Sequence, residues 1–378
     1  MAMFEGVFKI DKFLTIMNEK GGSDLFLTTG LEPSMKLNGR IVKIDQVKLT
    51  QDMVMDLMKE CFYDRPDLEN QFKTTFEANF AIQRPVLGRY RVSCFMQTGV
   101  PGFILRRIVS EIPTIEQLQI PEILRNLVMM KRGLILFVGA TGAGKSTTQA
   151  AMIGHRNRST EGHILSIEDP IEYVHHHDKS IITQREVGVD TESFDAALKS
   201  SLRQAPDVIL IGEIRSEETM QFALSFAETG HLCMATLHAN NANQAIERIM
   251  HLVPESKHRQ LLFDLSFNLR GVVAQQLVPT KDGKSRRAVF EILIGTPIVA
   301  DVLLKGELER LKQIMKDSKD LGMITFDQSL CDLYFSGVIR YEDALKYADS
   351  QNDVRLAIKL AEGKNRGDDS VLKNVGFH

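Results

Sequence analysis

The chain has 378 residues, enough for two or more compact units, and its 43% hydrophobic and 25% charged content is typical of globular proteins. A formal net charge of -3 gives no overall attraction for polyanions, so composition argues against a nucleic-acid partner. The four cysteines are widely separated and form no CxxC pair, which excludes a zinc ribbon or a secreted disulfide framework and favours a reducing cytoplasm.

The N-terminal sequence MAMFEGVFKIDKFL mixes charged with apolar residues and therefore lacks the apolar core of a signal peptide. No later apolar run approaches the ~20 residues that a membrane-spanning helix needs. We therefore expect no direct insertion into a membrane, so any membrane role must act through a partner.

Residues 1–110 have the pattern of a small α/β unit. Asn38-Gly39 separates two alternating stretches within residues 35–44, which is the strongest short signal for a β-hairpin. The segment 76–82 alternates apolar with polar residues and predicts a half-buried strand.

The segment 89–96 also alternates, with Tyr90 and Val92 on one face and Arg89 and Arg91 on the other. The sequence therefore predicts a strand from which two arginines project together at the outer face of a sheet.

The pattern changes after Pro113 and Pro121, which indicate a linker at residues 111–122. Beyond the linker, short and nearly continuous apolar runs alternate with segments long enough for helices. The runs cover residues 134–138, 164–167, 208–211 and 233–237. This alternation predicts a buried parallel sheet with helices on its faces.

The remaining segments divide the second half of the chain. Residues 123–295 contain the alternating runs, and residues 296–362 have mostly helical spacing. The last segment, 363–378, is polar and contains glycines, which predicts a frayed and disordered tail.

The sequence GATGAGKS at residues 139–146 fits the motif GxxxxGK[ST], and it stands between an apolar strand and a helix start as the motif requires. Backbone N–H groups of the loop would face the phosphates of a nucleotide, Lys145 would reach the β and γ oxygens, and Ser146 would hold Mg²⁺. The flanking strand and helix disfavour the alternative of a chance glycine-rich turn. The expected nucleotide-binding residues are Gly139, Ala140, Thr141, Gly142, Ala143, Gly144, Lys145, Ser146 and Thr147.

A P-loop alone binds nucleotide, whereas hydrolysis also needs acids near Mg²⁺ and near the attacking water. Glu168 follows the run 164–167, and Glu213 lies two residues after the run 208–211. Both acids should emerge at the carboxyl edge of the sheet, which is the ligand side of an open α/β sheet. Either acid alone is equally explained as a helix cap or a surface residue, but the pair beside one P-loop favours a hydrolytic site.

His231 and His238 lie on either side of the run 233–237. Seven residues span up to ~23 Å of strand or ~10 Å of helix, so we reject joint metal coordination. We expect His238 at the same edge as the two acids, near the γ-phosphate, or alternatively as the cap of the following helix. His231 stays open between a subunit contact, a loop hydrogen bond and a nucleotide contact. The three histidines at 175–177 cannot all face one ion on regular structure, which predicts a surface loop.

Four segments resemble, in order and spacing, the motifs of the secretion-superfamily ATPases that drive type IV pili and type II secretion. They are GATGAGKST, SIEDPIEYVHH, SLRQAPDVILIGEIRSEET and TGHLCMATLHANNANQAIERI, similar to the Walker A, Asp-box, Walker B and His-box of that family. The N-terminal sequence GSDLFLTTGLEPSMKLNGRI resembles the PAS-like domain of the same proteins. The resemblance implies an α/β fold with a PAS-like domain at 1–110, a RecA-like P-loop ATPase core at 123–295 and a helical C-terminal subdomain at 296–362.

The resemblance also implies roles for the acids. Glu213 matches the Walker B acid and Glu168 the Asp-box acid, and which of the two is the general base stays open. Gly212 stands where Walker B sequences usually have aspartate, so Mg²⁺ would be held chiefly by Ser146, phosphates and waters. Ser146 and Glu213 are the expected metal residues, and which of the two acids orders Mg²⁺ stays open. We expect Lys145, Glu168, Glu213 and His238 to carry catalysis.

In this family the subunits form a hexameric ring, and arginines of the N-terminal sheet approach the bound nucleotide. Arg91 and Arg106 stand in the matching positions, with Arg89 and Arg107 beside them. Guanidinium groups suit this role because they bind phosphate oxygens with two parallel hydrogen bonds. Without the resemblance, arginines on a solvated strand face would be the simpler interpretation.

The sequence favours the retraction group of the family, the PilT/PilU family. The chain begins at the PAS-like unit and lacks the four-cysteine zinc site that many assembly ATPases carry. Where PilT-type sequences have an AIRNLIRE element, this chain has PIVADVLLKG, with Ala300 and Asp301 in place of Arg and Asn. In this element the sequence resembles the PilU-like branch of the family, whose members assist retraction.

The expected function is therefore that of an ATP-hydrolysing, Mg²⁺-dependent homohexameric motor for pilus retraction and twitching motility. We expect it in the cytoplasm at the inner membrane, with a PilT-like retraction ATPase and the inner-membrane platform protein as partners. One alternative is an accessory ring that binds nucleotide but hydrolyses little. The other, a RecA-like nucleic-acid motor, shares the fold and is disfavoured by the near-neutral charge.

Overall fold

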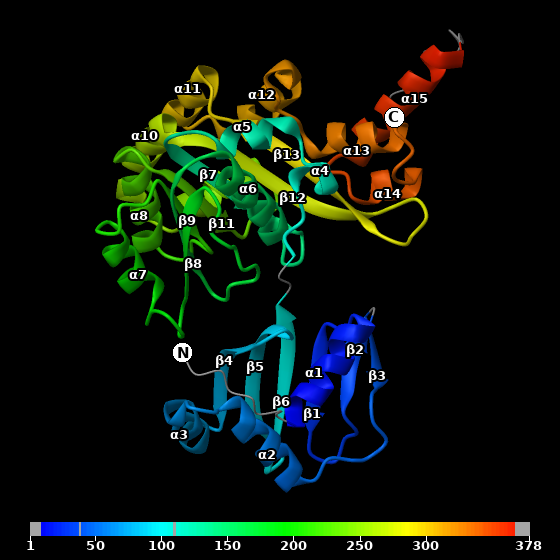
Figure 1. Ribbon diagram of the computed structural model, residues 1–378. Helices are drawn as coiled ribbons and strands as arrows, with labels where there is room; N and C mark the ends of the chain where they lie inside the picture. Colours follow the sequence, from blue (N-terminus) through cyan, green and yellow to red (C-terminus); the bar gives the residue numbers. More distant parts are fainter. Residues whose placement is uncertain (1–8, 38, 109–110, 367–378) are drawn as a thin grey trace. The chain divides into compact units, whose positions relative to one another are not determined.

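The structure is a computed structural model that describes residues 9–37, 39–108 and 111–366. The chain divides into two compact units, each with its own β-sheet (Figure 1). The main boundary lies between Ile112 and Pro113, and the short segment Glu172–Val174 is assigned to the first unit. Within the described ranges, every helix is too short or too polar to span a bilayer.

The first unit is an antiparallel sheet with the strand order β3-β2-β1-β6-β5-β4 and with helices packed on one face. Apolar side chains from both layers, such as Leu14, Met58 and Phe103, form its buried core. The strands are β1 (Asp24–Thr28), β2 (Ser34–Leu37), β3 (Arg40–Lys43), β4 (Glu77–Arg84), β5 (Gly88–Gln97) and β6 (Val100–Ile108). The helices are α1 (Lys9–Lys20), α2 (Gln51–Cys61) and α3 (Pro66–Thr75).

The strands predicted in the first unit are confirmed. Segments 76–82 and 89–96 correspond to β4 and β5, and the stretches within 35–44 form β2 and β3. Gly39 has a positive φ of 81°, a conformation that glycine adopts without steric cost. Asn38, the other residue of the predicted hairpin turn, lies outside the described residues.

The second unit contains a larger sheet with the order β13-β12-β7-β11-β10-β8-β9. All neighbours in it pair in parallel except β13, which pairs antiparallel with β12. The four predicted apolar runs are confirmed as β7, β8, β10 and β11. The strands are β7 (Gly133–Val138), β8 (Gly162–Glu168), β9 (Ser180–Glu186), β10 (Val208–Ile211), β11 (Leu232–Leu237), β12 (Leu269–Pro279) and β13 (Arg286–Ile294).

Helices cover both faces of this sheet, as predicted (Figure 1). Along β7, Leu134, Leu136 and Val138 face one core, whereas Ile135 and Phe137 face the other. A strand that is buried on both sides therefore reads as a continuous apolar run. In chain order, the helices of the second unit before β12 are α4 (Ile115–Leu118), α5 (Glu122–Val128), α6 (Lys145–Ser159), α7 (Phe194–Ser201), α8 (Glu217–Glu228), α9 (Ala242–Met250), η1 (Glu255–Lys257) and α10 (His258–Asn268).

The segment 111–122, expected to be a linker, is largely part of the second unit. Thr114 and Gln117 form a reciprocal capping box at the start of α4, and Ile115 and Ile120 are buried in the core below it. Two prolines suggested an irregular connection, but apolar side chains spaced between them dock this segment on the sheet.

Three strands of the second sheet were not predicted. The edge strand β9 carries polar residues such as Thr183 and Gln184, which conceal its pattern. Strand β12 begins at Leu269, directly after α10, without a turn signal between them. β13 follows β12 and pairs with it.

The predicted helical character of residues 296–362 is confirmed. The helix α15 extends to Arg366, so regular structure continues four residues into the predicted tail 363–378, because the single Gly363 weakens a helix by only about 1 kcal/mol. Residues 367–378 lie outside the described residues. The elements are α11 (Pro297–Lys305), η2 (Leu308–Arg310), α12 (Leu311–Asp317), η3 (Lys319–Leu321), α13 (Phe326–Phe335), α14 (Tyr341–Lys346) and α15 (Gln351–Arg366).

Candidate nucleotide-binding site

The predicted P-loop connects β7 to α6. Gly139, Gly142 and Gly144 have positive φ angles of 145°, 79° and 87°, which let the loop curl between the strand and the helix. A Cβ atom on Gly139 would lie 2.3 Å from the carbonyl oxygen of Gln275, so only glycine fits there. Ala140 is exposed on the other side of the loop. The loop therefore packs tightly against β12 and is open on the side where phosphates would bind.

Lys145, the first residue of α6, has its ammonium group inside the loop. Its Nζ donates hydrogen bonds to the carbonyl oxygens of Gly139, at 2.6 Å, and Ala140, at 3.0 Å, and only 8% of the residue is exposed. Ser146 follows, half-buried, in the first turn of the helix. Because helix N-termini attract anions, this turn suits phosphate binding.

Three predicted catalytic residues lie at the carboxyl ends of three neighbouring strands. Glu168 is the last residue of β8, Glu213 lies two residues beyond β10, and His238 directly follows β11. Because these strands run parallel beside one another, the three residues share the sheet edge from which the P-loop leaves β7.

The structure brings Glu213 and His238 together. His238 Nε2 lies 3.2 Å from Glu213 Oε1, and Arg215 Nη2 lies 2.6 Å from Glu213 Oε2. The hydrogen bond that Arg215 donates to the Glu213 carboxylate raises the pKa of Arg215. Both oxygens of this half-buried carboxylate are thus held in fixed directions, with an imidazole on one side and a guanidinium on the other.

His238 is not the helix cap that the sequence left as an alternative. Asn241 caps α9, because its side-chain oxygen accepts a hydrogen bond from the backbone N–H of Gln244 at 2.9 Å. The His238 side chain is therefore directed to Glu213 while Asn241 starts the helix.

Arg215 was missed in the sequence analysis. It also approaches Asp169, with its Nη1 3.7 Å from Asp169 Oδ2, and so joins the ends of β8 and β10. The signal in the sequence was its spacing of two residues from Glu213, which places both side chains on one side of an extended segment.

Glu168 is held separately from Glu213. Its Oε1 accepts hydrogen bonds from Ser166 Oγ at 2.7 Å and from Gln184 Nε2 at 3.3 Å. The backbone here is close to Gly212, because a Cβ atom on that glycine would lie 3.1 Å from Glu168 Cα. This crowding explains why glycine occupies the position before Glu213.

A hollow of about 320 Å³ adjoins the P-loop on the side of α9. Its wall includes His238, so the hollow connects the phosphate loop with the catalytic edge. The lining residues are Gly139, Ala140, His238, Ala239, Asn240, Gln244, Glu247, Arg248 and His251.

Two buried glutamines near the site were also missed in the sequence analysis: Gln275 lies beside the P-loop, and Gln149 joins α6 to β11. Gln275 is 3% exposed, and its Nε2 would lie 2.8 Å from a Cβ atom on Gly144. Gln149 on α6 accepts a hydrogen bond from Thr236 Oγ1 at 3.3 Å. Single polar residues in apolar segments gave no motif that could have identified them.

His231 lies at the other end of β11 from His238. Its Nδ1 lies 3.0 Å from Thr229 Oγ1 and 3.1 Å from the carbonyl oxygen of Phe226, so it closes the turn after α8 through a loop hydrogen bond. His175–His177 lie in an irregular segment with His176 and His177 exposed, which confirms the predicted surface loop. Among the described residues, no group of three or more His, Cys, Asp or Glu side chains is arranged to hold a metal ion.

The arginines of the first unit do not form one cluster. Arg91 on β5 lies directly opposite Arg106 on β6, and Arg106 Nε is 2.7 Å from Oδ1 of the buried Asp24. Arg107 lies opposite the buried Tyr90 in the pairing of β5 with β6. Because adjacent residues of a strand face opposite sides, its side chain lies on the other face of the sheet from that of Arg106. Arg91 and Arg106 thus share a face of the sheet that Arg107 does not.

Comparison with known proteins agrees with this geometry. Residues 110–319 match the family described as Type II/IV secretion system protein. The chain is 57% identical over 356 residues to the type IV pilus ATPase PilU of Pseudomonas aeruginosa, which covers 93% of this chain and 92% of PilU. It is 37% identical over 339 residues to the type IV pilus retraction ATPase PilT of the same organism, with 90% and 98% covered. The crystal structure of the pilus retraction motor PilT with bound ADP matches with a TM-score of 0.84 at 36% identity, over 93% of this chain and 99% of that one.

Proposed function

The chain belongs to the PilT/PilU family of type II/IV secretion ATPases, and from this premise we propose that it hydrolyses ATP to drive type IV pilus retraction. The identity to PilU, 57% against 37% to PilT, supports a PilU-like role beside a PilT-like motor. The observation that carries the proposal is the convergence of Glu168, Glu213 and His238 on the strand edge beside Lys145.

We propose that Lys145 and the backbone of 139–147 bind the phosphates of ATP. Phosphate oxygens would replace the carbonyl groups that Lys145 now contacts. His238 Nε2 would approach the γ-phosphate from its position against Glu213. A fixed imidazole and carboxylate can orient a water molecule without reorganising during the reaction, which is where such sites gain most of their rate.

We propose that Mg²⁺ accompanies the nucleotide. The donors present fit this ion, since Mg²⁺ is usually held by one or two protein oxygens together with phosphates and waters rather than by a full protein cage. Ser146 and Glu213 would hold it, and it would neutralise charge on the phosphates. Glu168, fixed by Ser166 and Gln184, stays available for the second acidic role.

We propose that the active form is a homohexamer in which Arg91 and Arg106 act on a nucleotide bound by the neighbouring subunit. Support comes from the ion pair with Asp24, which holds Arg106 in one direction while 68% of its side chain stays exposed. A guanidinium that is fixed and exposed is suited to binding phosphate from another subunit. The inner-membrane platform protein would receive the force.

ATP turnover by the purified protein tests the hydrolytic function. Turnover should fall at least about 100-fold in Lys145→Ala, which removes the charge that binds the phosphates, and in Glu213→Ala, which removes the carboxylate proposed to hold Mg²⁺ and orient the water molecule. The matched control is Arg107→Ala, which removes a charge from the face of the first sheet that carries no proposed site residue. Turnover that survives Lys145→Ala would contradict the proposal.

A second candidate is an accessory ring that binds ATP and docks on a PilT-like motor with little hydrolysis of its own. The element PIVADVLLKG favours it, because α11 carries Ala300 and Asp301 where PilT-type sequences have Arg and Asn. Restoration of twitching by a Lys145→Ala variant in cells that contain the PilT-like partner would support this candidate.

A further inference from the structure

Glu291 is a buried carboxyl group outside the site described above. It lies on β13 opposite Ala274 of β12 and is 1% exposed. Its Oε1 accepts a hydrogen bond from the backbone N–H of Ala242 at 2.9 Å. Its Oε2 is buried without a hydrogen-bond partner of normal geometry among the described residues. Such a group costs stability, so its presence in the core calls for a functional explanation.

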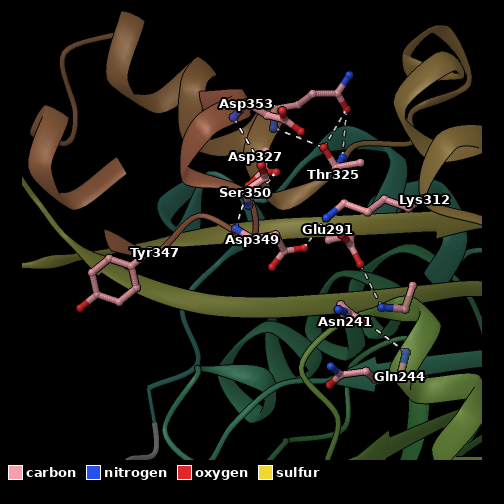
Figure 2. A network of polar contacts seen from close by, with 12 residues as sticks. Asn241, Gln244, Glu291, Lys312, Thr325, Asp327, Tyr347, Asp349, Ser350 and Asp353 are labelled. Carbon is pink, nitrogen blue, oxygen red and sulfur yellow. Dashed lines mark hydrogen bonds and ion pairs between the residues drawn. The ribbon is translucent and has the colours of Figure 1, made fainter. Parts of the chain in front are cut away.

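The carboxyl group of Glu291 lies at the N-termini of two helices. Ala242 is the first residue of α9, and the backbone N–H of Phe326, the first residue of α13, also acts on the carboxyl group. Because a negative charge is stabilised at a helix N-terminus, the carboxyl group of Glu291 can stabilise the N-termini of both α9 and α13. Figure 2 shows Glu291 between Asn241 at the start of α9 and Thr325 at the start of α13.

One of these helices continues directly from the catalytic edge. Only three residues separate His238 from Ala242, and Asn241 caps α9 while Gln244 Oε1 accepts a hydrogen bond from the N–H of Asn240 at 3.2 Å. The segment 238–241 is therefore short and constrained at its end. A displacement of the α9 N-terminus therefore has only three residues through which to reach His238.

The other side of Glu291 belongs to the C-terminal helices. Lys312 Nζ forms an ion pair with Asp349 Oδ2 at 2.9 Å, and Asp327 accepts hydrogen bonds from the backbone N–H groups of Asp349 and Ser350 (Figure 2). The side-chain amide of Asn243 in α9 also donates to the carbonyl oxygen of Leu308, at 2.8 Å. The Asn243 contact thus joins α9, which follows the catalytic loop, to the C-terminal helices.

We propose that Glu291 is a positioning residue, through which the helical C-terminal subdomain at 297–366 sets the place of His238 beside Glu213. This inference rests on the proposed ATPase function of the site. Movement of the C-terminal helices would displace the carboxyl group and release the start of α9. Nucleotide turnover and the arrangement of the subdomain would thus depend on each other.

The charge of Glu291 responds to pH near neutrality. Burial, with a smaller contribution from Asp349, raises the pKa of Glu291, whereas the backbone groups and Lys312 lower it, and the net result is a pKa of about 7. The ionised carboxylate is the stronger acceptor for the Ala242 N–H. The hydrogen bond from the Ala242 N–H to Glu291 should therefore strengthen as pH rises through about 7.

Two substitutions at Glu291 test the proposal in the full-length protein. Glu291→Leu keeps a similar volume and removes the acceptor, and Glu291→Gln keeps the acceptor and removes the charge. The matched control is Glu309→Gln, the same chemical change at an exposed position. The measurements are kcat and KM for ATP, the pH dependence of kcat, and hydrogen exchange of the amides at 238–245.

Glu291→Leu should lower kcat at least about tenfold with KM within about twofold, and should speed exchange at 238–245. Glu291→Gln should restore kcat and flatten its pH dependence between about 6 and 8. Wild-type kcat in the Leu variant, or a wild-type pH profile in the Gln variant, would overturn the proposal. If the wild-type protein shows no Lys145-dependent turnover, the proposed function fails, and unchanged exchange at 238–245 in the Leu variant separately overturns the role of Glu291.

Discussion

Gly212 lies where the ends of β8 and β10 approach each other too closely to leave room for a side chain. A Cβ atom there would lie 3.1 Å from Glu168 Cα and 3.1 Å from the carbonyl oxygen of Ile167, closer than most real Cβ contacts. The aspartate usual in Walker B sequences would therefore collide with the end of β8. The glycine allows β8 and β10 to end side by side, so that Glu168 and Glu213 reach one edge.

Substitution of Gly212 should be costly for this reason. Gly212 lacks a positive φ, so Gly212→Ala introduces crowding rather than backbone strain, and we expect it to lower the free energy of unfolding by roughly 1–3 kcal/mol. ATP turnover should fall as well, because the two strand ends separate. Chemical denaturation and turnover of the purified variant measure both effects, and an unchanged denaturation midpoint would show that the site has room for a side chain.

Glu291 should make stability depend on pH. Its pKa is raised from 4.5 to about 7 by burial, so the folded protein binds the proton more tightly than the unfolded chain between these values. Relative to Glu291→Gln, the wild-type protein should lose about 3 kcal/mol of stability as pH rises from 4.5 to 7, and no more above that. Denaturation of both proteins across pH 4–8 measures the difference. A constant difference would mean that Glu291 titrates normally.

At the scale of helices and strands, the start of α9 couples local stability to the site. Asn241→Ala removes the cap and should destabilise the protein by about 1 kcal/mol while loosening the segment that carries His238. Thr50→Ala removes a comparable cap from α2 in the first unit. We expect similar losses of stability in both variants but reduced ATP turnover only in Asn241→Ala. Equal turnover in the two would show that the α9 cap has no catalytic consequence.

The burial of an element determines whether the sequence predicts it. β7 lies between two cores, so the residues that follow its first glycine are all apolar. The P-loop after it is identified from the spacing of its glycines, lysine and serine alone. The edge strand β9 has no such pattern, and the start of β12 has no turn before it. The helix α4 was concealed by the prolines on both sides of it.

The same distinction holds for the candidate site. Glu168, Glu213 and His238 follow the ends of strands, where chain order determines position, and the P-loop motif places Lys145 at the start of α6, so the sequence was sufficient to group them. Arg215 could not be placed in the same way, since its partner depends on a side-chain direction rather than on a strand end. Gln275 and Gln149 depend on packing between distant segments.

At the scale of the whole molecule, the proposed ring requires that subunits complete one another's sites. Arg106→Ala and Lys145→Ala should each abolish turnover alone. Mixed in equal amounts, they should regain about one quarter of wild-type turnover, because one subunit supplies Lys145 and its neighbour supplies Arg106. Arg107→Ala, from the opposite face of β6, should remain active by itself. An inactive mixture would indicate that Arg106 does not act across subunits.

The central claim is that this chain hydrolyses ATP itself. The most direct test is ATP turnover by the purified wild-type protein, alone and mixed with a PilT-like ATPase, with a Lys145→Ala version of this chain in each condition. A chain that hydrolyses ATP itself will show turnover alone, and Lys145→Ala will abolish that turnover. Turnover that appears only in the mixture and is the same with Lys145→Ala would contradict the claim, and would leave this chain as a nucleotide-binding accessory.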